Sequence, residues 1–234
     1  MDHPVTGTRG SDGYENGLAD EREPDRELIS SERVWNGPIF AVDADHVRLD
    51  PGQEPVARQV VVHHDAVAVV ALREGAESSQ ADDAPEILMV RQYRHPVRAR
   101  LWEIPAGLLD VPGEAPVIAA ARELAEETDY TAATWNTLAE FYASPGFTTE
   151  GARIFLAQDL SLLPEDRRTV REDEEAEFVP TWVRLDEAVD AVMGGRLHNP
   201  STVLGVLATA QARARGWAEL RPADAPWLRS PESL

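Results

Sequence analysis

Three glutamates have a spacing that suits a divalent metal ion. In the run Arg122–Glu127, Glu123, Glu126 and Glu127 are three and four positions apart, so on a helix they share one face. Like charges at this spacing repel one another, and only Arg122 is close enough in sequence to offset them. Mg²⁺ and Mn²⁺ prefer such oxygen ligands. The pattern indicates either a metal site or an acidic helix face in solvent, which is common in acidic proteins.

The composition excludes several other kinds of site. The chain has 234 residues, with 42 acidic against 22 basic ones and a net charge of −20. Every basic residue is arginine, and cysteine is absent. Disulfide scaffolds, thiol nucleophiles, cysteine-bound zinc, Schiff-base lysines and P-loop lysines are therefore excluded. The acidity also argues against nucleic acid or anionic membranes as partners.

The cellular compartment follows from what the sequence lacks. No apolar run approaches the roughly 20 residues of a membrane span, and the start of the chain does not have the pattern of a signal peptide. We therefore expect a cytoplasmic protein with no membrane contact. An acidic protein that binds a phosphate ester needs local arginines or a bridging cation.

The hydrophobic pattern predicts an α+β protein. Short apolar runs predict strands at 39–42, 60–62, 67–72, 87–90, 141–142, 154–156 and 178–183. Helices are expected over 116–128, 186–194 and 201–215. We expect a disordered tail over 1–31, a small β-subdomain over 32–62, the main domain over 63–215, and an extended tail over 216–234 in which Trp227 packs on the body of the protein.

The residues before the glutamates extend the pattern. Gly107 is followed by Glu114, then by seven residues and the run Arg122–Glu127. Together they resemble the Nudix box, G-x5-E-x7-R-E-U-x-E-E-x-G-U, in which U is aliphatic. One extra residue lies between Gly107 and Glu114, and Asp129 and Tyr130 replace the last two residues of the pattern. Only the geometry at the end of the helix is put in doubt, because Asp adopts a left-handed conformation less easily than Gly.

The resemblance implies a fold and a metal site. The Nudix fold is a mixed β-sheet sandwiched between helices, here with the small N-terminal β-subdomain. By position, the ligands of Mg²⁺, or of Mn²⁺ in its place, would be the carboxylates of Glu123, Glu126 and Glu127 with the Ala106 carbonyl. Glu114 and Arg122 would form an ion pair that braces the loop against the helix.

A second motif narrows the implied substrate. Ser144-Pro145-Gly146, followed by Glu150, resembles a mark of the Nudix enzymes that cleave ADP-ribose, notably those of actinobacteria. This resemblance implies a homodimer in which N-terminal strands complete the partner's site. The implied substrate contacts are Arg94 on the diphosphate, Arg58 and Trp35 at the adenine, and Ser144 and Glu150 at the terminal ribose.

The catalytic base would lie on an acidic loop after the box. The matching run is 171–177, where Glu175 is the first candidate and Glu174 the second. The resemblance thus implies Mg²⁺-dependent hydrolysis of ADP-ribose to AMP and ribose 5-phosphate. Hydrolysis of ADP-sugars or other nucleoside diphosphate derivatives, a non-catalytic ADP-ribose sensor and a plain acidic interaction domain remain alternatives.

Overall fold

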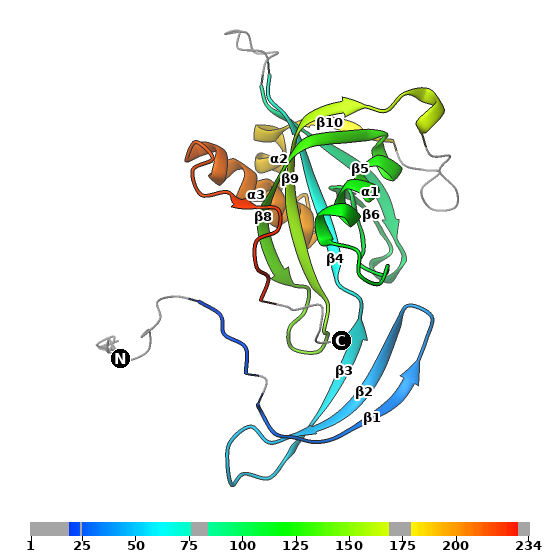
Figure 1. The fold of residues 1–234 in the computed structure, drawn as a ribbon, viewed down its shortest axis with the longest axis vertical. Helices are drawn as coiled ribbons and strands as arrows, with labels where there is room; N and C mark the ends of the chain where they lie inside the picture. The colour runs from blue at the N-terminus through cyan, green and yellow to red at the C-terminus, as the bar shows by residue number, and fades with distance from the viewer. Residues whose placement is uncertain (1–18, 24, 76–83, 169–178, 229–234) are drawn as a thin grey trace, which may run out of the picture.

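The computed structural model describes residues 19–23, 25–75, 84–168 and 179–228. Its strands form a three-stranded N-terminal sheet and an eight-stranded main sheet (Figure 1). The strands are β1 (Leu28–Asn36), β2 (Phe40–Val47), β3 (Val56–His63), β4 (Ala66–Arg73), β5 (Glu86–Arg94), β6 (Ala99–Glu103), β7 (Ala106–Leu108), β8 (Tyr130–Tyr142), β9 (Gly151–Leu162), β10 (Thr181–Arg184) and β11 (Arg221–Pro222). The helices are α1 (Pro116–Thr128), α2 (Leu185–Met193) and α3 (Pro200–Ala214), with single 3-10 turns at His95–Val97 and Glu165–Arg167.

The main sheet is mixed and buried on both faces. Its order is β10-β5-β4-β9-β8-β11, with β6 on β5 and β7 on β4, and β4 runs parallel to β9. Side chains of β4 alternate between the two faces. Val67, Val69 and Ala71 pack with α1 residues, whereas Ala68, Val70 and Leu72 pack with residues of α2 and α3. The predicted fold, a mixed sheet between helices, is confirmed.

The three predicted helices are present within one residue of their expected bounds. Helix α1 begins with Pro116 at a position that needs no backbone N–H donor. It ends at Asp129, which has φ 64° and donates its N–H to the Ala125 carbonyl at 3.0 Å. Asp129 therefore adopts the left-handed conformation expected in place of glycine. In the described part of the chain, no helix is long and apolar enough to cross a membrane.

The N-terminal sheet is joined to the main domain at two places. Strand β3 runs directly into β4, as Figure 1 shows. In addition, the segment 147–149 lies along β3, where Val61 donates to the Phe147 carbonyl at 2.7 Å and Thr149 donates to the Val61 carbonyl at 2.9 Å. Strand β1 is exposed at every residue, and it begins at Leu28, inside the region expected to be a tail.

Candidate active site

Helix α1 carries the three glutamates as the spacing predicts, but it buries them unequally. The side chains of Glu123 and Glu126 are 12% and 37% exposed, and residue Glu127 is 6% exposed. Glu123 lies directly over Gly107, where an added Cβ would fall 2.1 Å from the carboxylate. A larger residue at 107 would therefore require the Glu123 carboxylate to move.

Arg122 holds the loop before α1 against the helix. Its Nε and Nη2 donate to the two carboxylate oxygens of Glu114 at 3.3 and 3.1 Å, so the ion pair expected from the resemblance is present. Its Nη1 also donates to Glu123 at 2.6 Å and to Glu126 at 3.4 Å. The hydrogen bond to Glu114 is the main cause that raises the pKa of Arg122. One guanidinium thus contacts three carboxylates and offsets only part of the charge of the cluster.

Glu127 and Ala106 meet between the helix and β7. The Ala106 N–H donates to Glu127 Oε2 at 3.2 Å, so this edge of β7 faces α1. In an extended strand the N–H and C=O of one residue point to the same side. The Ala106 carbonyl therefore faces the same side as Glu127, which is the side that the predicted metal site requires.

The oxygen atoms of these residues are of the kind that binds a hard cation, although the side chains do not converge on one point. Carboxylate and carbonyl oxygens are the ligands that Mg²⁺ and Mn²⁺ prefer, and Gly107 leaves the space in which Glu123 lies. Among the described residues, no three His, Cys, Asp or Glu side chains are grouped as the ligands of one ion. Glu123 and Glu126 are bound by Arg122 Nη1 instead.

Arg94 is fixed by a residue that the sequence analysis did not select. Its Nε and Nη2 donate to the two carboxylate oxygens of Glu103 at 2.9 and 2.7 Å. Glu103 is 2% exposed, whereas the Arg94 side chain is 42% exposed. The β5–β6 pairing brings the two residues together. A lone acid inside the run Leu101–Ile104, next to an arginine-rich turn, was the signal available in the sequence.

Ser144 and Glu150 lie in the loop between β8 and β9, and both are partly buried. Asp65 connects this loop to the box. Its Oδ1 accepts a hydrogen bond from Gly151 N–H and its carbonyl accepts one from Leu109 N–H, both at 2.8 Å. Asp65 is 6% exposed and was also missed, because the pair His63-His64 before it predicted only the end of a strand.

Trp35 and Arg58 lie on opposite faces of the N-terminal sheet. Trp35 pairs with Val42 of β2, and Arg58 pairs with Asp45. Paired residues share a face, and residues three apart on one strand point to opposite faces. Trp35 is 47% exposed and stacks on Phe40 at 4.8 Å between ring centroids, while Arg58 is exposed. The two side chains of one chain therefore cannot sandwich one adenine.

The proposed base candidates, Glu174 and Glu175, lie outside the described residues.

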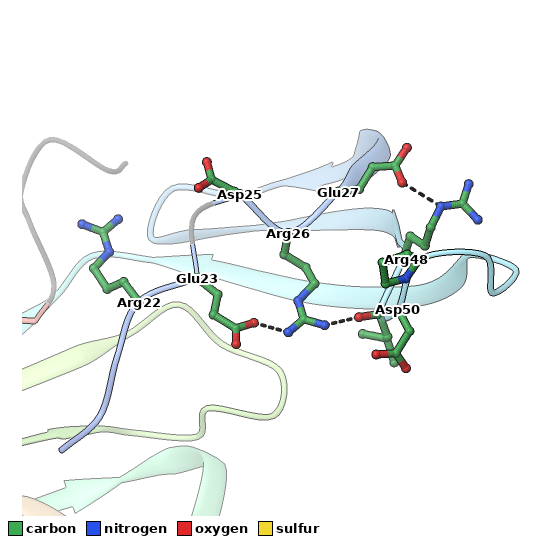
Figure 2. A pocket seen from close by; sticks show the side chains of 9 residues that line it. Arg22, Glu23, Asp25, Arg26, Glu27, Arg48 and Asp50 are labelled. Carbon is green, nitrogen blue, oxygen red and sulfur yellow. Dashed lines mark hydrogen bonds and ion pairs between the residues drawn. The ribbon is translucent and has the colours of Figure 1, made fainter. Parts of the chain in front are cut away.

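A surface cavity of about 610 Å³ lies away from all of the residues discussed above. Figure 2 shows two of its arginines bound to neighbouring acids, Arg26 to Glu23 and Arg48 to Glu27 at 2.7 Å. These guanidinium groups hold the segment before β1 in place, so we do not assign this cavity to a diphosphate.

Comparison with known proteins agrees with the box. The NUDIX domain family matches residues 62–201. The chain is 44% identical to the ADP-ribose pyrophosphatase of Mycobacterium tuberculosis over 212 residues, covering 91% of this chain and 96% of that protein. It is 35% identical to the ADP-ribose pyrophosphatase of Bacillus subtilis over 182 residues, covering 78% and 91%.

A solved structure described as an ADP compounds hydrolase has the same fold. It superposes with a TM-score of 0.63 at 20% identity and covers 85% of this chain and 98% of that chain. The box residues, their arrangement on α1 and β7, and the family match over most of the main domain agree with one another. The chain belongs to the Nudix family.

Proposed function

We propose that this chain hydrolyses ADP-ribose to AMP and ribose 5-phosphate. The choice of ADP-ribose as substrate rests on one observation. The 44% identity with an ADP-ribose pyrophosphatase extends over 91% of the chain, including the N-terminal sheet. In the reaction, water adds to one phosphorus and the bond from that phosphorus to the bridging oxygen breaks. One product keeps the bridging oxygen, and the other receives the oxygen of water.

Members of the Nudix family typically use divalent metals, and we propose Mg²⁺ here, with Mn²⁺ as a possible substitute. Glu123, Glu126, Glu127 and the Ala106 carbonyl would hold it, and Glu123 would have to leave Arg122 to do so. Bound there, the ion would neutralise diphosphate oxygens and lower the pKa of a water molecule. The base would be Glu175 or Glu174, which sequence alone places on the acidic loop.

Arg94 would hold the diphosphate. Glu103 fixes two of its guanidinium nitrogens, so the orientation of the planar group is set before substrate arrives. A cation that is already oriented stabilises a developing negative charge more strongly than one that must be ordered during the reaction. Ser144 and Glu150 would contact the terminal ribose from the loop that Asp65 connects to the box.

The adenine site would be shared between two subunits of a homodimer. Because Trp35 and Arg58 lie on opposite faces of one sheet, a site that uses both needs Trp35 of one subunit and Arg58 of the other. Strand β1 supports this proposal, since it is an exposed edge strand on which Leu28 and Val34 are 56% and 54% exposed. Residues 32–62 would then serve both dimerisation and substrate binding.

A substrate panel tests the proposal. Phosphate release coupled to a phosphatase is measured with and without Mg²⁺ for ADP-ribose, ADP-glucose, diadenosine polyphosphates and NADH. We expect the highest kcat/KM for ADP-ribose and no turnover in EDTA. An equal or higher kcat/KM for ADP-glucose would assign an ADP-sugar hydrolase, and binding of ADP-ribose without turnover would assign a sensor.

A further inference from the structure

The segment 221–228, here called the strap, crosses the face of the main sheet that also carries α1. Its first two residues form β11 on the edge of β8, and Figure 1 shows the chain then descending toward the β8–β9 hairpin. The Thr137 hydroxyl donates to the Pro222 carbonyl at 3.0 Å, and Ala225 is 6% exposed. The strap is therefore docked by hydrogen bonds and by apolar burial.

The strap ends over a buried charge. Arg153 of β9 is 3% exposed, and its Nε has no hydrogen-bond acceptor in the described part of the chain, whereas its Nη2 binds Glu140. Its guanidinium forms an ion pair with Glu140, directly across on β8, and lies 4.9 Å from the ring centroid of Trp227. An aromatic face stabilises a cation that has been removed from water. Trp227 thus packs on the body of the protein, as expected, and covers this cation.

A second arginine, which belongs to the strap, binds the same carboxylate. Arg221 Nη1 donates to Glu140 Oε2 at 2.9 Å, so Glu140 lies between a strap residue and Arg153. A buried ion pair is strongly destabilised when one partner is removed, because the remaining charge is left without compensation. The strap consequently fixes Glu140 and Arg153 from both ends.

This pair stands at the base of the loop that carries the proposed ribose contacts. Glu140 and Arg153 are opposite each other two residue pairs before the loop, which begins after the pair Tyr142 and Gly151. The loop is closed by the hydrogen bond from Ala143 N–H to the Glu150 carbonyl at 3.0 Å. Any shift of the pair therefore displaces the two ends of the loop.

We propose that Trp227 and Arg221 are positioning residues for substrate, which act through Arg153 and Glu140 on the loop 143–150. The inference rests on the proposed hydrolysis of ADP-ribose, because the loop would bind the ribose end. It assigns the strap a role in substrate affinity, in addition to its role in stability. The chemical step at α1 would be left nearly unchanged.

The test compares Trp227→Ala, Trp227→Phe and Arg221→Gln with the parent chain. We expect Trp227→Ala and Arg221→Gln to raise KM for ADP-ribose about three- to tenfold, with kcat within about twofold of the parent. Trp227→Phe retains an aromatic face and should restore KM. Arg213→Gln is the matched control, because it removes an exposed ion pair with Glu74, a partner outside this loop, and should leave KM unchanged.

Hydrogen exchange of the amides in 143–150 gives a readout that does not need activity. Exchange there should be faster in Trp227→Ala and Arg221→Gln than in the parent and in Arg213→Gln. Unchanged exchange, unchanged KM, or a fall in kcat alone would overturn the inference. If the parent chain does not hydrolyse ADP-ribose, the proposed function fails, and faster exchange would still support the positioning of the loop.

Discussion

Trp35 and Arg58 are held on opposite faces of one three-stranded sheet, with their β2 partners Val42 and Asp45 three residues apart. No rotation of either side chain brings both to the same face. A purine bound between these two residues must therefore lie between two copies of the chain. In the expected dimer, an adenine site that uses both residues would therefore take Trp35 from one subunit and Arg58 from the other.

The first prediction is complementation between subunits. Trp35→Ala and Arg58→Ala should each raise KM for ADP-ribose strongly as pure dimers. When the two variants are coexpressed, each mixed dimer contains one site with both residues intact, so about a quarter of all sites should regain parental activity. Steady-state kinetics of the mixture checks this, and absence of any recovery would place both residues of a site in one chain.

The second prediction concerns Glu127. Glu127→Gln keeps an oxygen that can accept from Ala106 N–H but removes the charge, so the fold should persist while kcat falls about 100-fold or more. Coupled phosphate release gives kcat, and calorimetric titration with Mg²⁺ should show weakened binding. Glu187→Gln on the exposed first turn of α2 is the control and should behave as the parent. Full activity of Glu127→Gln would refute the metal assignment.

The third prediction uses the close contact at Gly107. In Gly107→Ala the new methyl group must displace the Glu123 carboxylate, so activity should be nearly lost while circular dichroism stays close to that of the parent. At Gly146 an added Cβ meets nothing within 4 Å, which makes Gly146→Ala the matched glycine substitution; because Gly146 lies on the proposed ribose loop and not at α1, kcat should stay close to that of the parent even if KM changes. Equal activity of the two variants would contradict the role of Gly107.

The fourth prediction separates stability from phosphate binding at Arg94. Arg94→Met leaves Glu103 buried without its partner and should lower the free energy of unfolding by about 2 kcal/mol. Adding Glu103→Gln removes the unpaired charge, so the double variant should regain stability but not its affinity for ADP-ribose. Denaturant unfolding and KM measure the two effects. Recovery of KM in the double variant would exclude Arg94 as a diphosphate ligand.

The fifth prediction is a pH-independent stability contribution from Arg122. Its pKa is raised, chiefly by the hydrogen bond to Glu114, and a raised pKa stabilises the fold at every pH below the unfolded pKa of the group. That limit lies above the pH of any ordinary assay. The difference in Tm between the parent and Arg122→Met should therefore stay constant from about pH 6 to pH 9, and a difference that shrinks in this range would contradict it.

Local signals account for what the sequence predicted well. Helix α1 was predicted with its bounds because Pro116 starts it, apolar residues recur at helical spacing, and an aspartate can end it. The Glu114–Arg122 pair followed from the box resemblance. By contrast, most of β8 was missed, because its alanines and threonines form no apolar run and its burial comes from neighbouring strands.

Long-range pairing explains what the sequence did not reveal. Glu103 matters because a hairpin brings Arg94 to it, and Asp65 matters because it binds residues 44 and 86 positions further along the chain. No local pattern encodes such partners. The strand register likewise decides that Trp35 and Arg58 lie on opposite faces. It pairs Trp35 with Val42 and Arg58 with Asp45, and the sequence alone does not reveal these pairs.

The double attachment of the N-terminal sheet limits how the proposed dimer could change. Strand β3 continues into β4, and the same strand is hydrogen-bonded to Phe147 and Thr149 in the loop that would bind the ribose. The sheet is thus held in a fixed position and has no hinge. An insertion at His63 or His64 would not simply make the connection longer, because it would also shift β3 out of register with that loop. In the proposed dimer, a change in the contact between subunits would therefore also change the ribose end of the proposed pocket.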